Sequence, residues 1–287
     1  MSVDALHPPH DPAPPDLRPV TVLAEWAPGT FLENLAPGPD GSWWVTSPSH
    51  RFVERIDADG RRRAHVDLPA AATGVVADGD AALVACGEPG APGWSLLRVD
   101  DAGYAPYARL DDVTFANGLV RRDDELVVAD CLRGALVTVS PDGRVADLLV
   151  DPLLAPADPD GPLPGVNGLA LDPADDLVLT STGRGLVLRL RDGRLETVAD
   201  RLVGDDLAVA ADGTAYLATH TFDSILRLRP DGSRHDVAHL PGPTSVRSAP
   251  DGHGLVATTT GGLLTRGPDA GPARLVHLDV VPELEER

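Results

Sequence analysis

Lysine is absent from this sequence of 287 residues, so all 24 of its basic residues are arginines, against 44 aspartates and glutamates. The formal net charge is -20 at pH 7. An acidic surface repels the phosphate backbones of nucleic acids. We therefore expect no nucleic-acid partner.

Cysteine and long apolar runs are also scarce. Cys86 and Cys131 are too few for a disulfide framework, and we expect both to be small packing residues. No apolar run approaches the roughly 20 residues that span a bilayer. The N-terminal stretch "MSVDALHPPHDPAPPD" lacks the apolar core of a signal peptide. These features predict a cytoplasmic protein without membrane association and with a disordered, Pro-rich tail over residues 1–18.

What the sequence does have is a repeat of about forty residues. Six three-residue openings end in Leu or Val, and they begin at Glu33, Thr73, Asn117, Asn167, Asp205 and Thr244. Successive openings are 40, 44, 50, 38 and 39 residues apart. Further apolar runs follow each opening, separated by turns such as "DADG", "SPDG" and "RPDG". Because glycine takes the positive φ that hairpin turns need, each repeat predicts a four-stranded antiparallel meander.

Four strands in about forty residues are typical of a propeller blade. The sequence therefore predicts an all-β fold, a single six-bladed β-propeller over residues 19–287 with a central metal-binding channel. A two-sheet sandwich is the alternative, but it does not explain six matched openings. Either Pro19–Trp26 or the later run "ARLVHLDV" is expected to be outermost in the closing blade. Residues 151–165 are expected to form a loop between blades three and four.

The six openings are expected to line the channel, because the first strand of each propeller blade faces the central axis. Every opening residue carries a side-chain oxygen, and Glu33 and Asp205 carry carboxylates. Burying two carboxylates and two amides is costly unless a cation compensates them. All-oxygen ligation favours Ca²⁺, with Mg²⁺, Mn²⁺ or Zn²⁺ as substitutes. Alternatively, these residues only hydrogen-bond to water in the channel.

The loops between the second and third strands are expected to lie on the same face as the openings. They contribute the candidate pocket residues His50, Trp94, Asp130, Cys131, Arg184, His220, Phe222 and Thr260. His220 follows Asp205 in the same blade, so it is a candidate general acid or base beside a carboxylate and a cation. The alternative is a loop histidine that only shapes the pocket.

The motifs "FLENL", "FANGL", "GVNGL" and "GDDLAVAADGTAYLATH" resemble the SMP-30/gluconolactonase/LRE-like family, and more distantly the paraoxonases and strictosidine-synthase-like proteins. The resemblance covers residues 19–280. It implies that Glu33, Asn167 and Asp205 bind a divalent cation, that Asn117 is a ligand or a substrate contact, and that Asp205 also acts as a base. Leu35 stands where the sugar lactonases typically have proline, so the resemblance identifies the superfamily rather than a sugar substrate.

The leading hypothesis is a Ca²⁺-dependent hydrolase of a small lactone or ester, in which Asp205 or His220 activates water. The candidate substrate contacts are Asn117, His50, Asp130, Arg184 and Phe222. One alternative is a non-hydrolytic cyclase or lyase of small-molecule biosynthesis, and another is a non-catalytic metal-binding propeller. We expect a small-molecule substrate and a monomer or weak homodimer.

Overall fold

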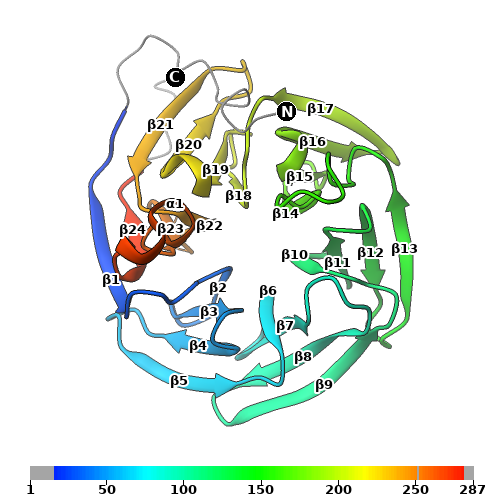
Figure 1. Cartoon of the computed structure of the whole chain (residues 1–287), viewed down its shortest axis with the longest axis horizontal. Helices are drawn as coiled ribbons and strands as arrows, with labels where there is room; N and C mark the ends of the chain where they lie inside the picture. Colours follow the sequence, from blue (N-terminus) through cyan, green and yellow to red (C-terminus); the bar gives the residue numbers. More distant parts are fainter. Residues whose placement is uncertain (1–15, 251, 281–287) are drawn as a thin grey trace.

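Six four-stranded antiparallel sheets are arranged as blades around a central channel (Figure 1). The computed structural model describes residues 16–250 and 252–280. Within each sheet the strands follow one another from the channel outward, in the order of the chain except in the closing blade. The predicted six-bladed propeller is therefore confirmed.

Each blade has an innermost strand next to the channel and a second strand beside it. The innermost strands are β2 (Leu35–Pro37), β6 (Ala71–Asp78), β10 (Ala116–Arg122), β14 (Val166–Leu171), β18 (Leu207–Val209) and β22 (Pro243–Ser248). The second strands are β3 (Trp43–Ser47), β7 (Ala81–Gly87), β11 (Glu125–Asp130), β15 (Leu177–Ser181), β19 (Ala215–Thr219) and β23 (Leu255–Thr259).

The two outer positions complete each blade. The third strands are β4 (Phe52–Ile56), β8 (Trp94–Asp100), β12 (Ala135–Val139), β16 (Leu186–Arg191), β20 (Ser224–Leu228) and β24 (Ala273–Leu278). The outermost strands are β5 (Arg62–Asp67), β9 (Gly103–Leu110), β13 (Val145–Val150), β17 (Arg194–Asp200), β21 (Arg234–His239) and β1 (Val20–Trp26).

The ring closes through β1, which pairs antiparallel with β24 from Val20 opposite Leu278 to Trp26 opposite Ala273. The N-terminal strand is therefore the outermost one of blade six, and the C-terminal strand β24 lies third, between β23 and β1. The first and last strands of the described residues thus share one sheet, and their ladder closes the ring.

The chain before β1 runs along blade five, where the Arg18 N–H donates to the Val237 carbonyl at 2.8 Å. The rest of the tail expected over residues 1–18, up to residue 15, lies outside the described residues. No helix in the part of the chain that the structure describes is long and apolar enough to cross a membrane.

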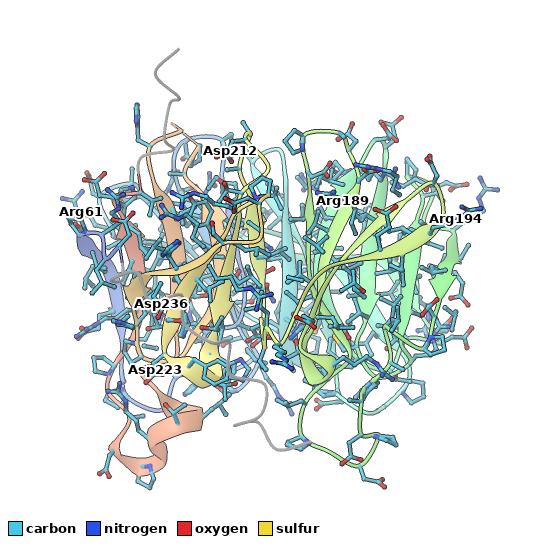
Figure 2. All side chains as sticks on the ribbon, turned by 90° about the horizontal axis from the view of Figure 1, so that it is seen from above. Arg61, Arg189, Arg194, Asp212, Asp223 and Asp236 are labelled. Atoms are coloured by element: carbon cyan, nitrogen blue, oxygen red, sulfur yellow. The ribbon has the colours of Figure 1, made fainter. Side chains whose placement is uncertain are left out.

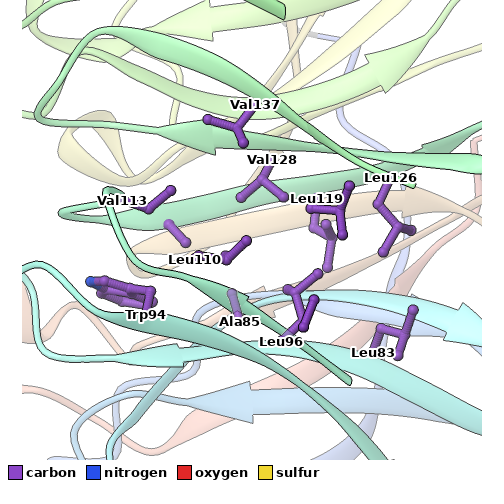
Figure 3. Close-up of a cluster of buried hydrophobic side chains, with 13 residues drawn as sticks. Leu83, Ala85, Trp94, Leu96, Leu110, Val113, Leu119, Leu126, Val128 and Val137 are labelled. Carbon is purple, nitrogen blue, oxygen red and sulfur yellow. The ribbon is translucent and has the colours of Figure 1, made fainter. Parts of the chain in front are cut away.

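Apolar side chains fill the spaces between neighbouring blades. Figure 3 shows one such cluster, in which Leu83 and Leu96 of blade two face Leu119, Leu126 and Val128 of blade three. All five side chains are at most 3% exposed. Because sheets pack face to face through alternate residues of their strands, this layer fixes the angle between the blades.

Close to the channel, the inner strands approach one another too closely for any side chain but glycine. A Cβ atom at Gly74 would overlap the Asn117 carbonyl, and one at Gly118 would overlap the Asn167 carbonyl. Both glycines directly follow an opening residue, and the β-ladder shifts register there, between Ala72 and Val75 and between Ala116 and Leu119. Each bulge therefore aims the preceding side chain into the channel.

The two faces of the ring differ. The short helix α1 (Leu263–Arg266) and Asp223 lie on one face, at the bottom of Figure 2, whereas Asp212 lies on the opposite face. Residues 151–165, which connect β13 to β14, contain no helix or strand, as expected. Their proline-rich segment and α1 both line the cavity described below, which places that cavity on the α1 face.

We expect Gly74→Ala to lower the free energy of unfolding by about 1–3 kcal/mol, because its Cβ overlaps backbone of the next blade. Urea unfolding followed by circular dichroism measures this change. Gly271→Ala is the control, since its Cβ meets only the Gly261 carbonyl oxygen, at 3.9 Å, and we expect a change within about 0.5 kcal/mol. Equal stability of the two variants would contradict the close-approach argument.

Candidate metal centre and active site

On the α1 face the channel widens into a cavity of about 550 Å³. Five of the six opening residues line it, namely Glu33, Thr73, Asn117, Asn167 and Asp205, and His220 joins them. The sixth, Thr244, donates its hydroxyl to the Leu32 carbonyl at 2.9 Å and takes no part in the lining. The register of the repeats thus places five polar side chains, one from each of five blades, in one cavity.

Each buried carboxylate in this cavity accepts a hydrogen bond from an asparagine of another blade. Asn117 Nδ2 donates to Glu33 Oε1 at 2.6 Å, and Asn34 Nδ2 donates to Asn117 Oδ1 at the same distance. Asn167 Nδ2 donates to Asp205 Oδ1. Both carboxylate residues are 8% exposed, so water screens them little.

Burial raises the pKa of Glu33 to about 8, helped by the charge of Asp205 and opposed by the hydrogen bond from Asn117. Burial likewise raises the pKa of Asp205 to about 8, helped by neighbouring Asp206 and opposed by the bond from Asn167. Asp206 itself accepts hydrogen bonds from Ser245 and Arg247. The two carboxylates of the cavity therefore lack the positive charge that their ionised forms require.

The donor set fits a hard divalent cation. Across residues 16–250 and 252–280, no three His, Cys, Asp or Glu side chains gather as a metal-holding group, so any ligation here depends on the amides as well. Asn117 Oδ1 accepts from Asn34, and as a carbonyl oxygen it has a second lone pair. Carboxylate and amide oxygens are the ligands that Ca²⁺ prefers. A cation would also supply the missing positive charge.

His220 lies beside Asp205, one of the candidate cation ligands. It begins the 3₁₀ turn η3 (His220–Phe222) after β19, and its Nδ1 is 3.5 Å from Asp205 Oδ2. That nitrogen is buried and makes no hydrogen bond. Burial lowers the pKa of His220 to about 4, against the opposing charge of Asp223. The imidazole is therefore neutral at neutral pH, and its contact with Asp205 is not an ion pair.

Two of the other predicted substrate contacts lie outside the cavity lining and hold its walls. The buried Asp130 carboxylate accepts hydrogen bonds from the Thr114 and Phe115 N–H groups, and from Arg133 Nε at 3.0 Å. Arg184 Nε donates to the Ala155 carbonyl at 2.9 Å, which ties down the connection between β13 and β14. Both side chains therefore use their polar atoms in hydrogen bonds that hold loops in place.

The remaining predicted pocket residues also lie outside the cavity lining. His50 is exposed, and its Nδ1 is 2.8 Å from the hydroxyl of Ser49, which does line the cavity. Phe222 is half-buried in η3 and outside the lining. Cys131 is fully buried, with its Sγ 3.9 Å from Asn167 Oδ1. Trp94 packs against Phe115, with ring centroids 5.8 Å apart, and Thr260 bonds to the Gly242 carbonyl.

Sequence reasoning missed the apolar wall of the cavity. Its members are Phe31, Pro48, Pro89, Phe115, Pro162, Leu163, Pro164 and Leu264. Phe31 and Phe115 each stand two residues before an opening residue, in "FLENL" and "FANGL", and that shared spacing was a usable signal. The prolines lie in loops without a common register.

The structure is a six-bladed propeller in which buried, oxygen-bearing side chains of five blades line one cavity. Neither a family model nor a curated protein matches the sequence. Among solved structures, a calcium-binding protein, regucalcin from Agrobacterium tumefaciens, is similar with a TM-score of 0.69 at 18% identity, over 91% of this chain and 95% of that one.

Two further solved structures carry different activities on a similar fold. A gluconolactonase from Xanthomonas campestris has a TM-score of 0.67 at 17% identity, over 94% of this chain and 96% of that one. Virginiamycin B lyase from Staphylococcus aureus has a TM-score of 0.61 at 14% identity, over 88% and 82%. At these identities the similarity establishes the fold, while the activity has to be argued from the site.

We expect the metal-free protein to lose stability as pH rises. Glu33 and Asp205 have folded-state pKa values near 8, above their ordinary values of 4.5 and 3.8. At these two carboxyl groups the folded state thus binds more protons than the unfolded state, so their contribution to stability is complete below about pH 4 and is lost as pH rises through 8. His220, with its pKa lowered from 6.5 to about 4, opposes this loss between those two values, so the loss is clearest from pH 7 to 8. Urea midpoints in a chelator at pH 5, 6, 7 and 8 measure this loss.

Glu33→Gln should flatten this pH dependence, whereas the exposed Glu125→Gln should leave it unchanged. Added Ca²⁺ should raise the midpoint more at pH 8 than at pH 5, because it competes with protons for the same carboxylates. A midpoint that rises with pH in the chelated wild-type protein would contradict the assigned shifts.

Proposed function

We propose that this protein is a divalent-cation-dependent hydrolase that opens a small lactone or ester, with Ca²⁺ as the cation. The observation that carries the proposal is the convergence of Glu33, Asn117, Asn167 and Asp205 with a neutral histidine in one cavity. Similarity to regucalcin and to a gluconolactonase supports it at the level of fold.

In this proposal Glu33, Asn167 and Asp205 hold the cation, and Asn117 either joins them or contacts the substrate. A cation held there would act as a Lewis acid toward the substrate carbonyl and would offset the negative charge that develops on its oxygen. The chain's own ionisable groups then handle the proton. His220 Nδ1 makes no hydrogen bond and lies 3.5 Å from Asp205 Oδ2, so we assign it to take the proton from the attacking water and to return it to the leaving alkoxide oxygen as the acyl carbon–oxygen bond breaks.

A lyase is the second candidate, and the unpaired nitrogen of His220 is what favours it. A neutral buried imidazole can remove a proton from carbon as well as from water. The fold similarity to virginiamycin B lyase supports this reading as well. Cyclisation of a bound substrate would use the same cavity through orientation. Analysis of the product separates these reactions, because only hydrolysis incorporates oxygen from ¹⁸O-labelled water.

We expect turnover of neutral lactones or esters that a chelator abolishes and Ca²⁺ restores. Asp205→Asn should remove activity while the protein stays folded. His220→Ala should lower kcat by about 10²–10⁴-fold, the usual contribution of a general base. His239→Ala is the matched control, because His239 is an exposed histidine at the end of β21 in the same blade, and we expect wild-type kcat.

Three outcomes would count against the proposal. Absence of turnover for every lactone and ester with Ca²⁺, Mg²⁺, Mn²⁺ and Zn²⁺ would contradict the hydrolase. Turnover that survives chelation would contradict the role of the cation. A chelator that lowers only the melting temperature, in a protein without activity, would favour a structural metal in a non-catalytic propeller.

A further inference from the structure

We propose that the cavity selects neutral, largely apolar lactones or esters, whose hydrocarbon part lies against the apolar wall of the cavity and whose carbonyl lies beside His220. This inference rests on the proposed function and deepens it. Three features of the cavity carry it, which are the apolar chemistry of its wall, the absence of arginine among the described residues that line it, and the fixed position of Phe115.

The wall of the cavity is mostly apolar and contains four prolines, Pro48, Pro89, Pro162 and Pro164. Proline has no backbone N–H group, so these positions offer a ligand no amide donor. The other apolar side chains of the wall are Phe31, Phe115, Leu163 and Leu264. A polyhydroxylated ligand would leave many of its hydroxyls without hydrogen-bond partners here, and each unpaired buried hydroxyl is costly.

The charges of the cavity disfavour an anionic substrate. Among the described residues that line it, the ionisable side chains are Glu33, Asp205 and His220, with no arginine. A phosphate or carboxylate group on the substrate would find no side-chain counter-charge here, because the two carboxylates already balance the charge of a single divalent cation. The net charge of -20 adds repulsion over a longer range. A neutral molecule avoids both costs.

The apolar wall draws on segments from several blades. Phe31 and Phe115 come from the segments that enter blades one and three, and Leu264 comes from α1 in blade six. Phe115 is held in place by Trp94 and by the hydrogen bond from its N–H group to Asp130. This part of the wall is therefore preorganised to contact an apolar substituent.

The test compares kcat/KM, in saturating Ca²⁺, for γ-lactones with alkyl substituents of increasing length and for D-glucono-δ-lactone. We expect kcat/KM to rise by up to about fourfold per added methylene, the full value of burying one CH₂ group. The Leu264→Asp substitution, at a residue that is 59% exposed, should flatten this rise without disturbing the core. Leu148→Asp, at a 39% exposed leucine on β13, is the matched control and should keep the wild-type slope.

A binding measurement tests the same cavity without turnover. The neutral fluorescent probe N-phenyl-1-naphthylamine should bind the wild-type protein and the Leu148→Asp variant, and bind Leu264→Asp several-fold more weakly. An alkyl γ-lactone should displace the probe, and D-glucono-δ-lactone should not. Absence of probe binding to the wild-type protein would overturn the inference.

The two proposals fail in different ways. A flat alkyl series, or a sugar lactone turned over faster than the alkyl lactones, would overturn the apolar selectivity and leave the hydrolase standing. No turnover of any lactone or ester would overturn the hydrolase. In that case, probe binding that weakens in Leu264→Asp and not in Leu148→Asp would still support an apolar ligand for the cavity.

Discussion

The centre of this propeller depends on how closely the inner strands of neighbouring blades approach one another. Gly74 packs on the Asn117 carbonyl, Gly118 on the Asn167 carbonyl and Gly168 on the backbone of Asp206. No larger residue fits at these contacts, so the channel is narrow where the opening side chains enter it. The same packing that completes the ring therefore forces carboxylates and amides into one small volume.

That crowding has an electrostatic consequence. Glu33 and Asp205 lose their hydration and repel each other, and the amides of Asn117 and Asn167 compensate them only in part. A hard cation removes the conflict, whereas the metal-free protein resolves it by holding protons. The stability of the fold, its affinity for a cation and its uptake of protons are thus coupled through Glu33 and Asp205.

The repeat was strong enough to predict the blades, because alternation along strands and Asp-Gly turns are local signals. The sequence did not decide which terminal strand is outermost in the closing blade. Both runs are amphipathic and either could pair at the edge, and only the ladder from Val20 to Trp26 against β24 settles it. The loop residues were harder still. Asp130 and Arg184 suggest chemistry by type. Asp130 instead accepts from backbone N–H groups and from Arg133, and Arg184 donates to a backbone carbonyl, and the sequence does not reveal these backbone partners.

The sequence by itself determined the six blades and the register of their openings, since a period of about forty residues places equivalent positions around one axis. It also named the residues that carry oxygen at those positions. Only the tertiary structure decided which loop residues face the cavity and what its wall is made of. Proline-rich loops of different lengths meet there through packing across blades, and contacts between segments so distant in the chain leave no periodic trace in the sequence.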